Sequence, residues 1–241
     1  MKLTFLGTKG YIEASTPRHR RHSSLMVAYK GREVMIDCGE DWLGRITGLN
    51  PRAIMVTHGH PDHAWGLKKG APCPVYATEE TWKTVKGFDI GDPRVIDFRI
   101  PTEVEHITFE ALPVVHSTRA PAVRYRATAG NAAIFYVPDV VYIKERNEAL
   151  GGVKIYIGDG ATVQRSMVRK SKEDVLIGHT PLRTQLTWCA DEGVPLAIFT
   201  HCGSRIIGGD EPTLAALIRR MAKERGLEAK IAYDGMETVV R

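Results

Sequence analysis

The feature that most constrains this chain is a six-residue cluster at positions 58–63, with the sequence H-G-H-P-D-H. The apolar run at 52–57 predicts a short buried strand, and Pro61 followed by Asp62 predicts a helix start. Because side chains alternate along extended backbone, His58 and His60 point the same way, while the turn redirects Asp62 and His63. Three imidazoles and a carboxylate on one strand-to-helix loop predict ligands for two adjacent metal positions.

Three further ligand-type residues follow apolar runs later in the chain. His116 follows 111–115, Asp139 follows 133–138 and His201 follows 196–200. Taken singly, His116 is also compatible with a strand end and Asp139 with a turn or helix cap. Side chains at the carboxyl ends of strands meet at one edge of an open α/β sheet, which is where such folds present functional groups.

The signature H-x-H-x-D-H, followed in order by these three residues, resembles the metallo-β-lactamase superfamily. The resemblance implies an α/β fold with four αββα layers and a metal site at one edge. It implies two divalent metal ions, with Zn²⁺ expected and Mn²⁺ or Fe as alternatives. It also implies the ligands of each ion. One ion is expected to bind His58, His60 and His116, the second is expected to bind Asp62, His63 and His201, and Asp139 is expected to bridge the two.

Asp37, in the run V-M-I-D-C-G, matches the early aspartate of the superfamily at a strand end. We interpret it as a residue that orients a ligand histidine rather than as a ligand. A simple turn residue before Gly39 is the alternative.

Length and composition are those of a globular chain. With 241 residues, 43% of them hydrophobic, the chain can bury a full core, and we expect a single domain over 1–241. No apolar run approaches the roughly 18 to 20 residues of a membrane span, and the N-terminus leads directly into an apolar strand. We therefore expect a cytoplasmic protein with no membrane contact. The four cysteines have no C-x-x-C spacing, so the pattern predicts no disulfide framework or zinc ribbon.

The periodicity of apolar residues predicts fourteen short strands, and pattern alone supports only α/β or α+β. Helical patterns fit five segments, at 41–48, 78–86, 162–171, 181–192 and 212–225.

The net charge of +5 and the pI near 9.0 favour an anionic partner. Residues 18–22, R-H-R-R-H, form a basic loop that suits either phosphate binding or a solvated surface, and its histidines are not assigned to metal. Arg21 and Ser23 lie in a stretch that resembles the superfamily's substrate side, so both are predicted to bind substrate.

The residue types at two positions of the site indicate which of the superfamily's reactions is favoured. The imidazole of His60 stands where related oxygen reductases carry glutamate, which favours zinc-type hydrolysis. Asp139 stands where β-lactamases carry cysteine, and supports a paired-metal site as in lactonases, thioesterases and phosphodiesterases. Such a site lowers the pKa of a bridging water towards about 7 and neutralises charge on a phosphorane-like transition state.

A third element, Gly178-His179-Thr180, resembles the G-H-S/T element of ribonuclease Z and related phosphodiesterases. The segment 159–162, D-G-A-T, resembles their H-E-A-T segment, although Asp and Gly replace its first two residues. His179 is predicted to donate a proton to a phosphoryl or leaving oxygen while Asp159 holds its other ring nitrogen. Together with Asp62 they form the predicted catalytic set. The alternative is a histidine in a helix-capping turn.

The nineteen residues between Asp139 and Asp159 are too few for the arm by which ribonuclease Z grips tRNA. The sequence therefore predicts a dinuclear phosphodiesterase acting through a metal-bridging hydroxide on a small, cyclic or single-stranded nucleic-acid substrate. The first alternative is a carboxylic ester, thioester or lactone hydrolase with the same ligands. The second is a non-catalytic metal-binding protein. The expected partner is a phosphodiester or other small anionic substrate, with nucleic acid as a further candidate. The sequence does not decide between a monomer and a homodimer.

Overall fold

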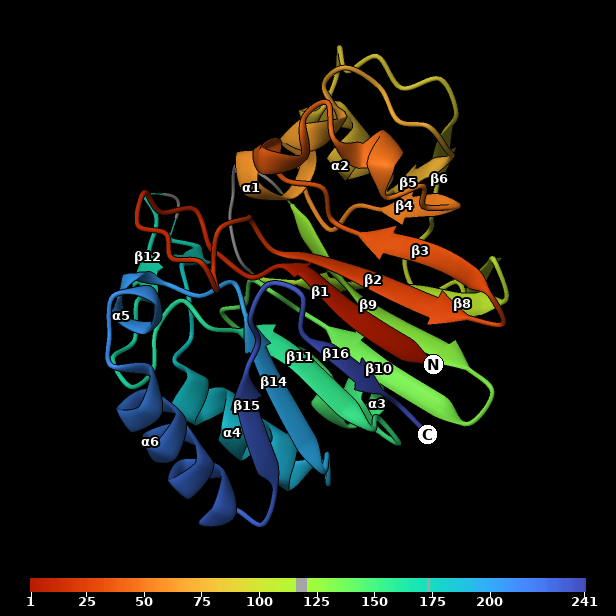
Figure 1. Ribbon diagram of the computed structural model, residues 1–241. Coiled ribbons are helices and arrows are strands. Elements are labelled where there is room, and N and C mark those ends of the chain that lie inside the picture. The colour runs from red at the N-terminus through yellow and green to blue at the C-terminus, as the bar shows by residue number, and fades with distance from the viewer. Residues whose placement is uncertain (116–120, 173) are drawn as a thin grey trace.

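The computed structural model describes residues 1–115, 121–172 and 174–241, and two seven-stranded sheets face each other in it (Figure 1). The first sheet has the spatial order β16-β1-β2-β3-β4-β5-β6. Its strands are β1 (Lys2–Gly7), β2 (Ser24–Tyr29), β3 (Arg32–Ile36), β4 (Ala53–Met55), β5 (Val75–Ala77), β6 (Pro93–Val95) and β16 (Glu237–Val239).

The second sheet has the spatial order β15-β14-β11-β10-β9-β8-β7. Its strands are β7 (Thr102–Val104), β8 (Ile107–Val114), β9 (Ala122–Ala129), β10 (Ala132–Tyr136), β11 (Ile155–Asp159), β14 (Leu196–Thr200) and β15 (Glu228–Ile231). A separate hairpin pairs β12 (Arg169–Lys170) with β13 (Leu176–Ile177). The two chain ends lie close together, because β16 pairs with β1 in the register Lys2↔Val239.

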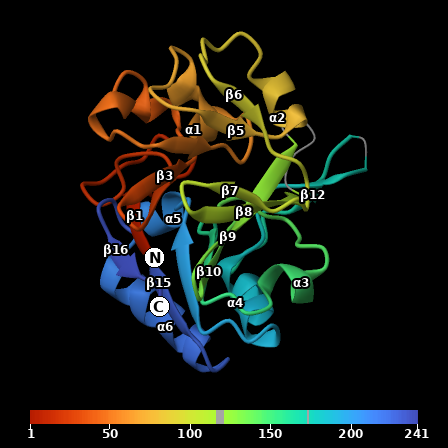
Figure 2. The ribbon, with the colours of Figure 1, turned by 90° about the vertical axis from the view of Figure 1, so that its right-hand side faces the viewer.

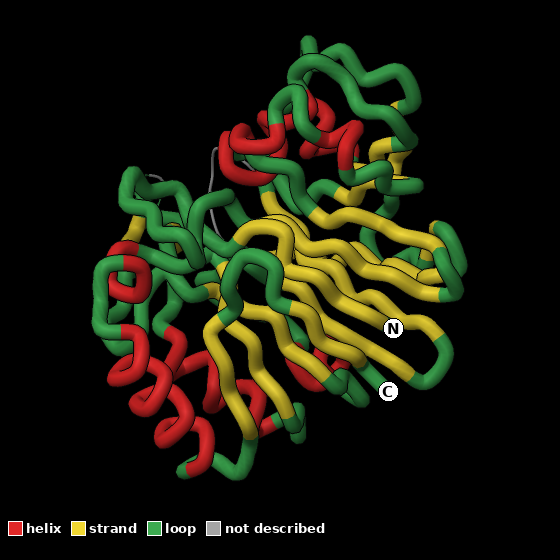
Figure 3. The backbone as a smooth tube through the Cα atoms, viewed as in Figure 1, coloured by secondary structure: helices red, strands yellow, loops and turns green. Residues whose placement is uncertain are grey.

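Helices cover the outer face of each sheet (Figures 1 and 3), and the view from the side shows the same layering (Figure 2). On the first sheet lie α1 (Pro61–Ala64), α2 (Glu79–Thr84) and the short 3₁₀ turns η1 (Glu40–Trp42), η2 (Ile46–Gly48) and η3 (Trp65–Leu67). On the second lie α3 (Arg146–Leu150), α4 (Leu182–Asp191) and α6 (Glu211–Lys223), with α5 (Ser204–Ile207) near the edge.

Three apolar clusters fill the three interfaces between these layers. Phe5, Ile36 and Phe109 belong to the cluster between the sheets. Leu186 and Ile218 belong to the cluster that joins α4 and α6 to the second sheet, and a smaller one lies under the helices of the first. Each sheet is therefore apolar on both faces, which explains the near-continuous apolar runs of its central strands. The αββα sandwich implied by the sequence is confirmed.

The topology gathers several strand ends at one edge. Strands β10, β11 and β14 are parallel neighbours, so their carboxyl ends come out together. They lead to Asp139, to Asp159 and to His201, while β4 of the other sheet leads to His58. In Figure 1 this edge lies on the left, beside α1, α5 and β12. The fold thus brings residues that are up to 143 positions apart in the sequence (58 to 201) into one place.

Two helix predictions are wrong. Residues 162–171 form a turn and the first strand of the β12–β13 hairpin, and 41–48 forms two separate 3₁₀ turns. In the first case the polar side chains satisfy the backbone locally, since Thr162 Oγ1 donates to the Arg165 carbonyl at 2.6 Å and Ser166 Oγ accepts from Val168 N at 3.1 Å. Such side-chain bonds compete with helix formation.

Within the described residues, no helix combines the length and apolar character needed to cross a membrane.

Candidate active site

Four buried side chains converge at the edge where the strands end. One ligand atom from each of Asp62, His63, Asp139 and His201 lies within 4.8 Å of the others. His201 Nε2 is 3.0 Å from Asp62 Oδ2, and His63 Nε2 is 2.8 Å from Asp139 Oδ2. Two imidazole nitrogens and two carboxylates form a donor set suited to a divalent ion such as Zn²⁺.

A second pair of histidines lies next to this group. Nε2 of His58 is 2.8 Å from Nδ1 of His60 and 3.4 Å from Asp139 Oδ2. The other carboxylate oxygen of Asp139, Oδ1, is 3.3 Å from His201 Nε2. Asp139 therefore lies between the His58–His60 pair and the four-residue group, a position that suits a bridging ligand. His116, the remaining predicted ligand, lies outside the described residues.

Two of the histidines are held in the orientation that a metal requires. Asp37 Oδ2 lies 2.8 Å from Nδ1 of His63, and Thr57 Oγ1 lies 3.0 Å from Nδ1 of His58. Thr57 also donates its backbone N–H and its hydroxyl to Asp37. With Nδ1 engaged, each ring directs Nε2 at the cluster, as in carboxylate–histidine–metal arrangements. The residues present therefore fit a divalent metal.

The backbone at the site is locally unusual. Asp37 and His201 have positive φ angles of 62° and 51°, in the left-handed region that is uncommon for non-glycine residues. Both follow directly on strand ends, where the left-handed turn redirects the side chain into the site. Gly39 permits the close packing around them, because a Cβ there would lie 2.3 Å from the Asp62 carbonyl oxygen. Strain of this kind is common at functional sites.

The carboxylates set the protonation of the cluster. Burial lowers the pKa of His63, but the charges of Asp62, Asp37 and Asp139 outweigh it, so this pKa lies well above the usual value. Burial raises the pKa of Asp62, yet His63 and His201 bring it well below its usual value. An ionised carboxylate is the form that binds a metal.

His179 and Asp159 come together beside this cluster, as the sequence predicted. Nδ1 of His179 is 2.8 Å from Asp159 Oδ2 and 3.4 Å from Asp139 Oδ1. Burial lowers the pKa of His179, but Asp159 outweighs this effect and the pKa rises to about 9. Asp159 itself is fixed by the backbone N–H groups of Val140 and Ala161 at 3.1 and 2.8 Å. The pair resembles an acid–base dyad.

Gln185, which the sequence did not single out, holds both halves of this dyad in place. It is fully buried on α4 and makes four hydrogen bonds. Its Oε1 accepts from Asp159 N at 3.0 Å and from the Tyr156 hydroxyl at 2.9 Å. Its Nε2 donates to the carbonyls of Asp159 at 2.8 Å and of Thr180 at 2.9 Å. The Gln185 side-chain amide thus links the end of β11 to the turn after His179 by hydrogen bonds.

Replacing Gln185 by leucine is expected to lower the free energy of unfolding by about 3 kcal/mol, because buried polar groups lose their partners. Urea denaturation measures this. The matched control is Thr187→Ala, on the exposed face of the same helix. A fall in turnover that is larger for substrates with poor leaving groups, at full metal content, would show that Gln185 positions His179. Equal rates for the variant and the wild type would contradict that role.

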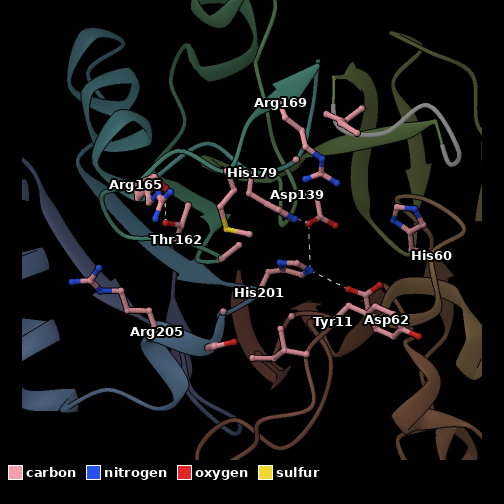
Figure 4. A pocket seen from close by; sticks show the side chains of 18 of the residues that line it. Tyr11, His60, Asp62, Asp139, Thr162, Arg165, Arg169, His179, His201 and Arg205 are labelled. Atoms are coloured by element: carbon pink, nitrogen blue, oxygen red, sulfur yellow. Dashed lines mark hydrogen bonds and ion pairs between the residues drawn. The ribbon is translucent and has the colours of Figure 1, made fainter. Parts of the chain in front are cut away.

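The cluster and the dyad open into one cavity of about 670 Å³ (Figure 4), a volume typical of small-molecule sites. His60, Asp62, Asp139, His179 and His201 lie on its wall. Three arginines also line it and were missed by the sequence analysis: Arg165, Arg169 and Arg205. Two of them lie in the segment expected to be a helix, so their shared side was not visible from the pattern.

Of the three residues predicted to bind substrate, His179 lines the cavity, whereas Arg21 and Ser23 lie elsewhere. Ser23 is fully buried, with its hydroxyl 3.4 Å from the Lys9 carbonyl. The Arg21 guanidinium lies over the Trp42 ring, 4.4 Å from its centre. Neither lines the cavity. Their substrate role stays a prediction, and the contacts that the structure shows are packing contacts.

The basic loop is anchored to the C-terminal turn. Asp234 accepts hydrogen bonds from the backbone N–H groups of Arg20 and Arg21. Arg18 pairs with Glu211 at 2.9 Å and lies over the Tyr233 ring. His19 is buried, with Nδ1 2.8 Å from Thr8 Oγ1, and His22 Nδ1 is 2.8 Å from Asp41 Oδ2. These contacts give the loop a structural role.

Comparison with known proteins identifies the family. The family described as the Beta-lactamase superfamily domain matches residues 32–202, which include all the predicted ligands. The chain belongs to this superfamily. As a member with this ligand cluster, it is a metal-dependent hydrolase.

One relative within the superfamily covers nearly the whole chain. Ribonuclease Z of Methanopyrus kandleri is 26% identical over 99% of this chain and 98% of its own length. That alignment spans 284 positions, more than the 241 residues of this chain, so the relative carries segments that are missing here.

Two solved structures share the fold. Zn²⁺-bound PqqB from Methylobacterium extorquens has a TM-score of 0.73 at 18% identity and covers 99% of this chain and 100% of its own. The short form of human tRNase Z has a TM-score of 0.67 at 18% identity and covers 100% of both chains. At these identities the likeness shows the superfamily fold alone.

Proposed function

We propose that this metal-dependent hydrolase is a dinuclear phosphodiesterase that acts on a small, cyclic or single-stranded nucleic-acid substrate. The observation that carries the proposal is the His179–Asp159 pair. His179 lines the same cavity as the ligand cluster, and its Nδ1 is 3.4 Å from Asp139 Oδ1. The pair is not part of the group formed by Asp62, His63, Asp139 and His201, although Asp159, His179 and His201 form a second group of ligand-type atoms within 4.8 Å of one another. An imidazole held at Nδ1 by a carboxylate can donate the proton on Nε2 to an oxygen of the substrate.

The ligand cluster supports two divalent ions in this proposal, with Asp139 between His58 and His60 on one side and His63 and His201 on the other. The chemistry that such a pair supplies is Lewis-acid stabilisation of phosphoryl charge and activation of the attacking water. Zn²⁺ suits the imidazole-rich ligands, with Mn²⁺ or Fe as alternatives.

The residues of the chain then have separate tasks. Asp37 and Thr57 hold the ligand histidines, and Asp62 binds metal while it faces the cavity. His179 protonates the leaving oxygen, and Asp159 orients it. The cavity walls place the diester between the ligand cluster and His179. The protein family of ribonuclease Z, to which curated relatives belong, supports a phosphodiester as the bond that is cleaved.

The size of the cavity and the compact connection after Asp139 favour a short substrate. Between Asp139 and the start of β11 at Ile155 the described chain forms only turns and α3, which packs with Ala149 and Leu150 into the core of the second sheet. No protruding arm arises from this stretch. We therefore propose that the substrate is held by the cavity itself and not by a distant surface.

A substrate panel on the metal-loaded protein tests the proposal. We expect bis(p-nitrophenyl) phosphate, 2′,3′-cyclic nucleotides or single-stranded oligonucleotides to be hydrolysed with a higher kcat/KM than p-nitrophenyl acetate, thioesters or lactones. Initial rates under one buffer and metal condition make the comparison direct. A higher kcat/KM for a lactone or thioester would contradict the proposal and favour the carboxylic-ester alternative. Full metal occupancy with no turnover of any substrate would favour a binding protein.

A further inference from the structure

Among the described residues, three guanidinium groups on the cavity wall have no carboxylate partner. Arg165, Arg169 and Arg205 are exposed to solvent and line the cavity. Within residues 1–115, 121–172 and 174–241, no aspartate or glutamate lies within ion-pair distance of any of them. Arginines elsewhere on the surface do pair, as Arg18 does with Glu211 and Arg94 with Asp92, each at 2.9 Å.

Two of the three arginines lie away from the metal ligands. In Figure 4, Arg165 and Arg205 lie on the opposite side of His201 from His60 and Asp62, and Arg169 lies next to His179. The lining also includes apolar side chains, among them Ile12, Met167 and Ile177. The cavity therefore has a metal-binding end with His60 and Asp62 and an opposite end with Arg165 and Arg205, and part of its wall is apolar.

The hairpin that carries two of these arginines is tied to His179. Met167 N donates to the His179 carbonyl at 3.1 Å, and β12 pairs with β13, which leads directly to Gly178 and His179. Gly178 has a φ of 110°, and a Cβ there would lie 2.3 Å from the Met167 carbonyl oxygen. The close packing at this glycine fixes the hairpin, and so Arg169, relative to the dyad.

We propose that Arg165, Arg169 and Arg205 form a subsite for a second anionic group of the substrate, a phosphate separated from the scissile diester by an uncharged organic moiety. Guanidinium groups bind phosphate oxygens through bidentate, charge-assisted hydrogen bonds. The apolar part of the lining suits a nucleoside or similar group. This inference rests on the proposed function for the nature of the scissile bond, but the subsite can be measured by binding alone.

A bound anion makes the arrangement more favourable. Like charges on one cavity wall repel each other, and a bound anion reduces the repulsion that no carboxylate of the described residues offsets. A cavity of about 670 Å³ accommodates one small molecule and not a continuous polymer track. The substrate class that fits both ends is a small phosphodiester with one additional phosphate.

A matched pair of ligands tests the subsite on the metal-loaded protein. Thymidine 3′,5′-bisphosphate and thymidine 5′-monophosphate differ only in the second phosphate. By calorimetry, we expect the bisphosphate to bind at least about tenfold more tightly. In the double variant Arg165→Ala/Arg169→Ala this ratio should fall to about one, while the Kd of the monophosphate changes little. Arg205→Ala alone should lower the ratio in part.

Arg183→Ala is the control, because it removes the same charge from the exposed face of α4, outside the cavity, and should leave the ratio unchanged. Equal affinity of the wild type for both ligands would overturn the inference. So would an unchanged ratio in the double variant. Thymidine oligonucleotides whose affinity rises by a similar factor with every added phosphate would overturn the assignment of a small substrate.

Rates separate this inference from the proposed function. The p-nitrophenyl ester of thymidine 5′-phosphate can be prepared with or without a 3′-phosphate, and the kcat/KM ratio of the two should follow the binding ratio in each variant. If neither ester is hydrolysed, the proposed phosphodiesterase function fails while the binding ratio still decides the subsite. If both are hydrolysed at equal kcat/KM, the function stands and the subsite fails.

Discussion

Replacing Asp139 by alanine is expected to remove one of two metal ions preferentially and to abolish nearly all turnover. Its two oxygens lie 2.8 Å from His63 Nε2 and 3.3 Å from His201 Nε2, with His58 Nε2 at 3.4 Å. In the proposed dinuclear site, a residue between the two groups of histidines would bind both ions, and we expect the weaker site to depend on it most. Loss of several kcal/mol of Lewis-acid stabilisation corresponds to a rate decrease of about 10³ or more.

Elemental analysis of the reconstituted protein measures the loss of metal, and initial rates on bis(p-nitrophenyl) phosphate measure the loss of turnover. Asp191→Ala, at the exposed end of α4, is the control and should keep both ions. Asp139→Asn keeps the shape of the side chain and separates loss of a ligand from loss of the fold, which circular dichroism reports. Two ions per chain with normal turnover in the alanine variant would show that Asp139 is no bridging ligand.

Replacing His179 by alanine is expected to keep both metals and the fold while it lowers phosphodiester turnover by about 10² to 10⁴, the usual range for loss of a positioned acid or base. The reason is geometric. His179 is held by Asp159 at 2.8 Å inside the cavity, and it lies outside the group of Asp62, His63, Asp139 and His201. Substrates with a p-nitrophenolate leaving group should be affected less than those with an alkoxide, because they need little protonation.

The measurement is a pair of rate constants, one for each type of leaving group, together with the metal content of the variant. His106→Ala is the control, since His106 is exposed and distant in the fold from the cavity lining. Loss of metal from the His179 variant would show that it is a ligand or a structural support. Full phosphodiesterase activity would remove the main support for the proposed function.

Much of the metal site could be predicted from the sequence because its residues follow a fixed local pattern. The spacing at 58–63 depends on one strand, one turn at Pro61 and one short helix, all within a few residues. Asp139 and His201 were recognisable because each follows an apolar run, and Asp159 because the segment 159–162 resembles the H-E-A-T segment. The fold then brings these ends together, since β10, β11 and β14 are parallel neighbours.

The sequence pattern was misleading where local polar contacts and strand pairing compete with helix propensity. Residues 162–171 have helical spacing, but their side-chain hydrogen bonds and the pairing of β12 with β13 select a hairpin. The short edge strands β7 and β16 were also missed, because each is defined by the neighbour with which it pairs. A strand of three residues has too little periodicity of its own to be recognised.

The sequence by itself therefore determined an α/β or α+β fold, and its resemblance to the superfamily implied the αββα sandwich that is confirmed; it also predicted the ligand types and the order in which they occur. Only the tertiary structure decided which residues surround them. Gln185 lies on a helix whose pattern shows a buried face, and only the packed fold puts its amide against Asp159 and Thr180. Arg165, Arg169 and Arg205 come from two segments that meet at one cavity, whereas Arg21 and Ser23 turn out to pack elsewhere. The reason is that such contacts join residues far apart in the chain, and no local pattern encodes the distance between them.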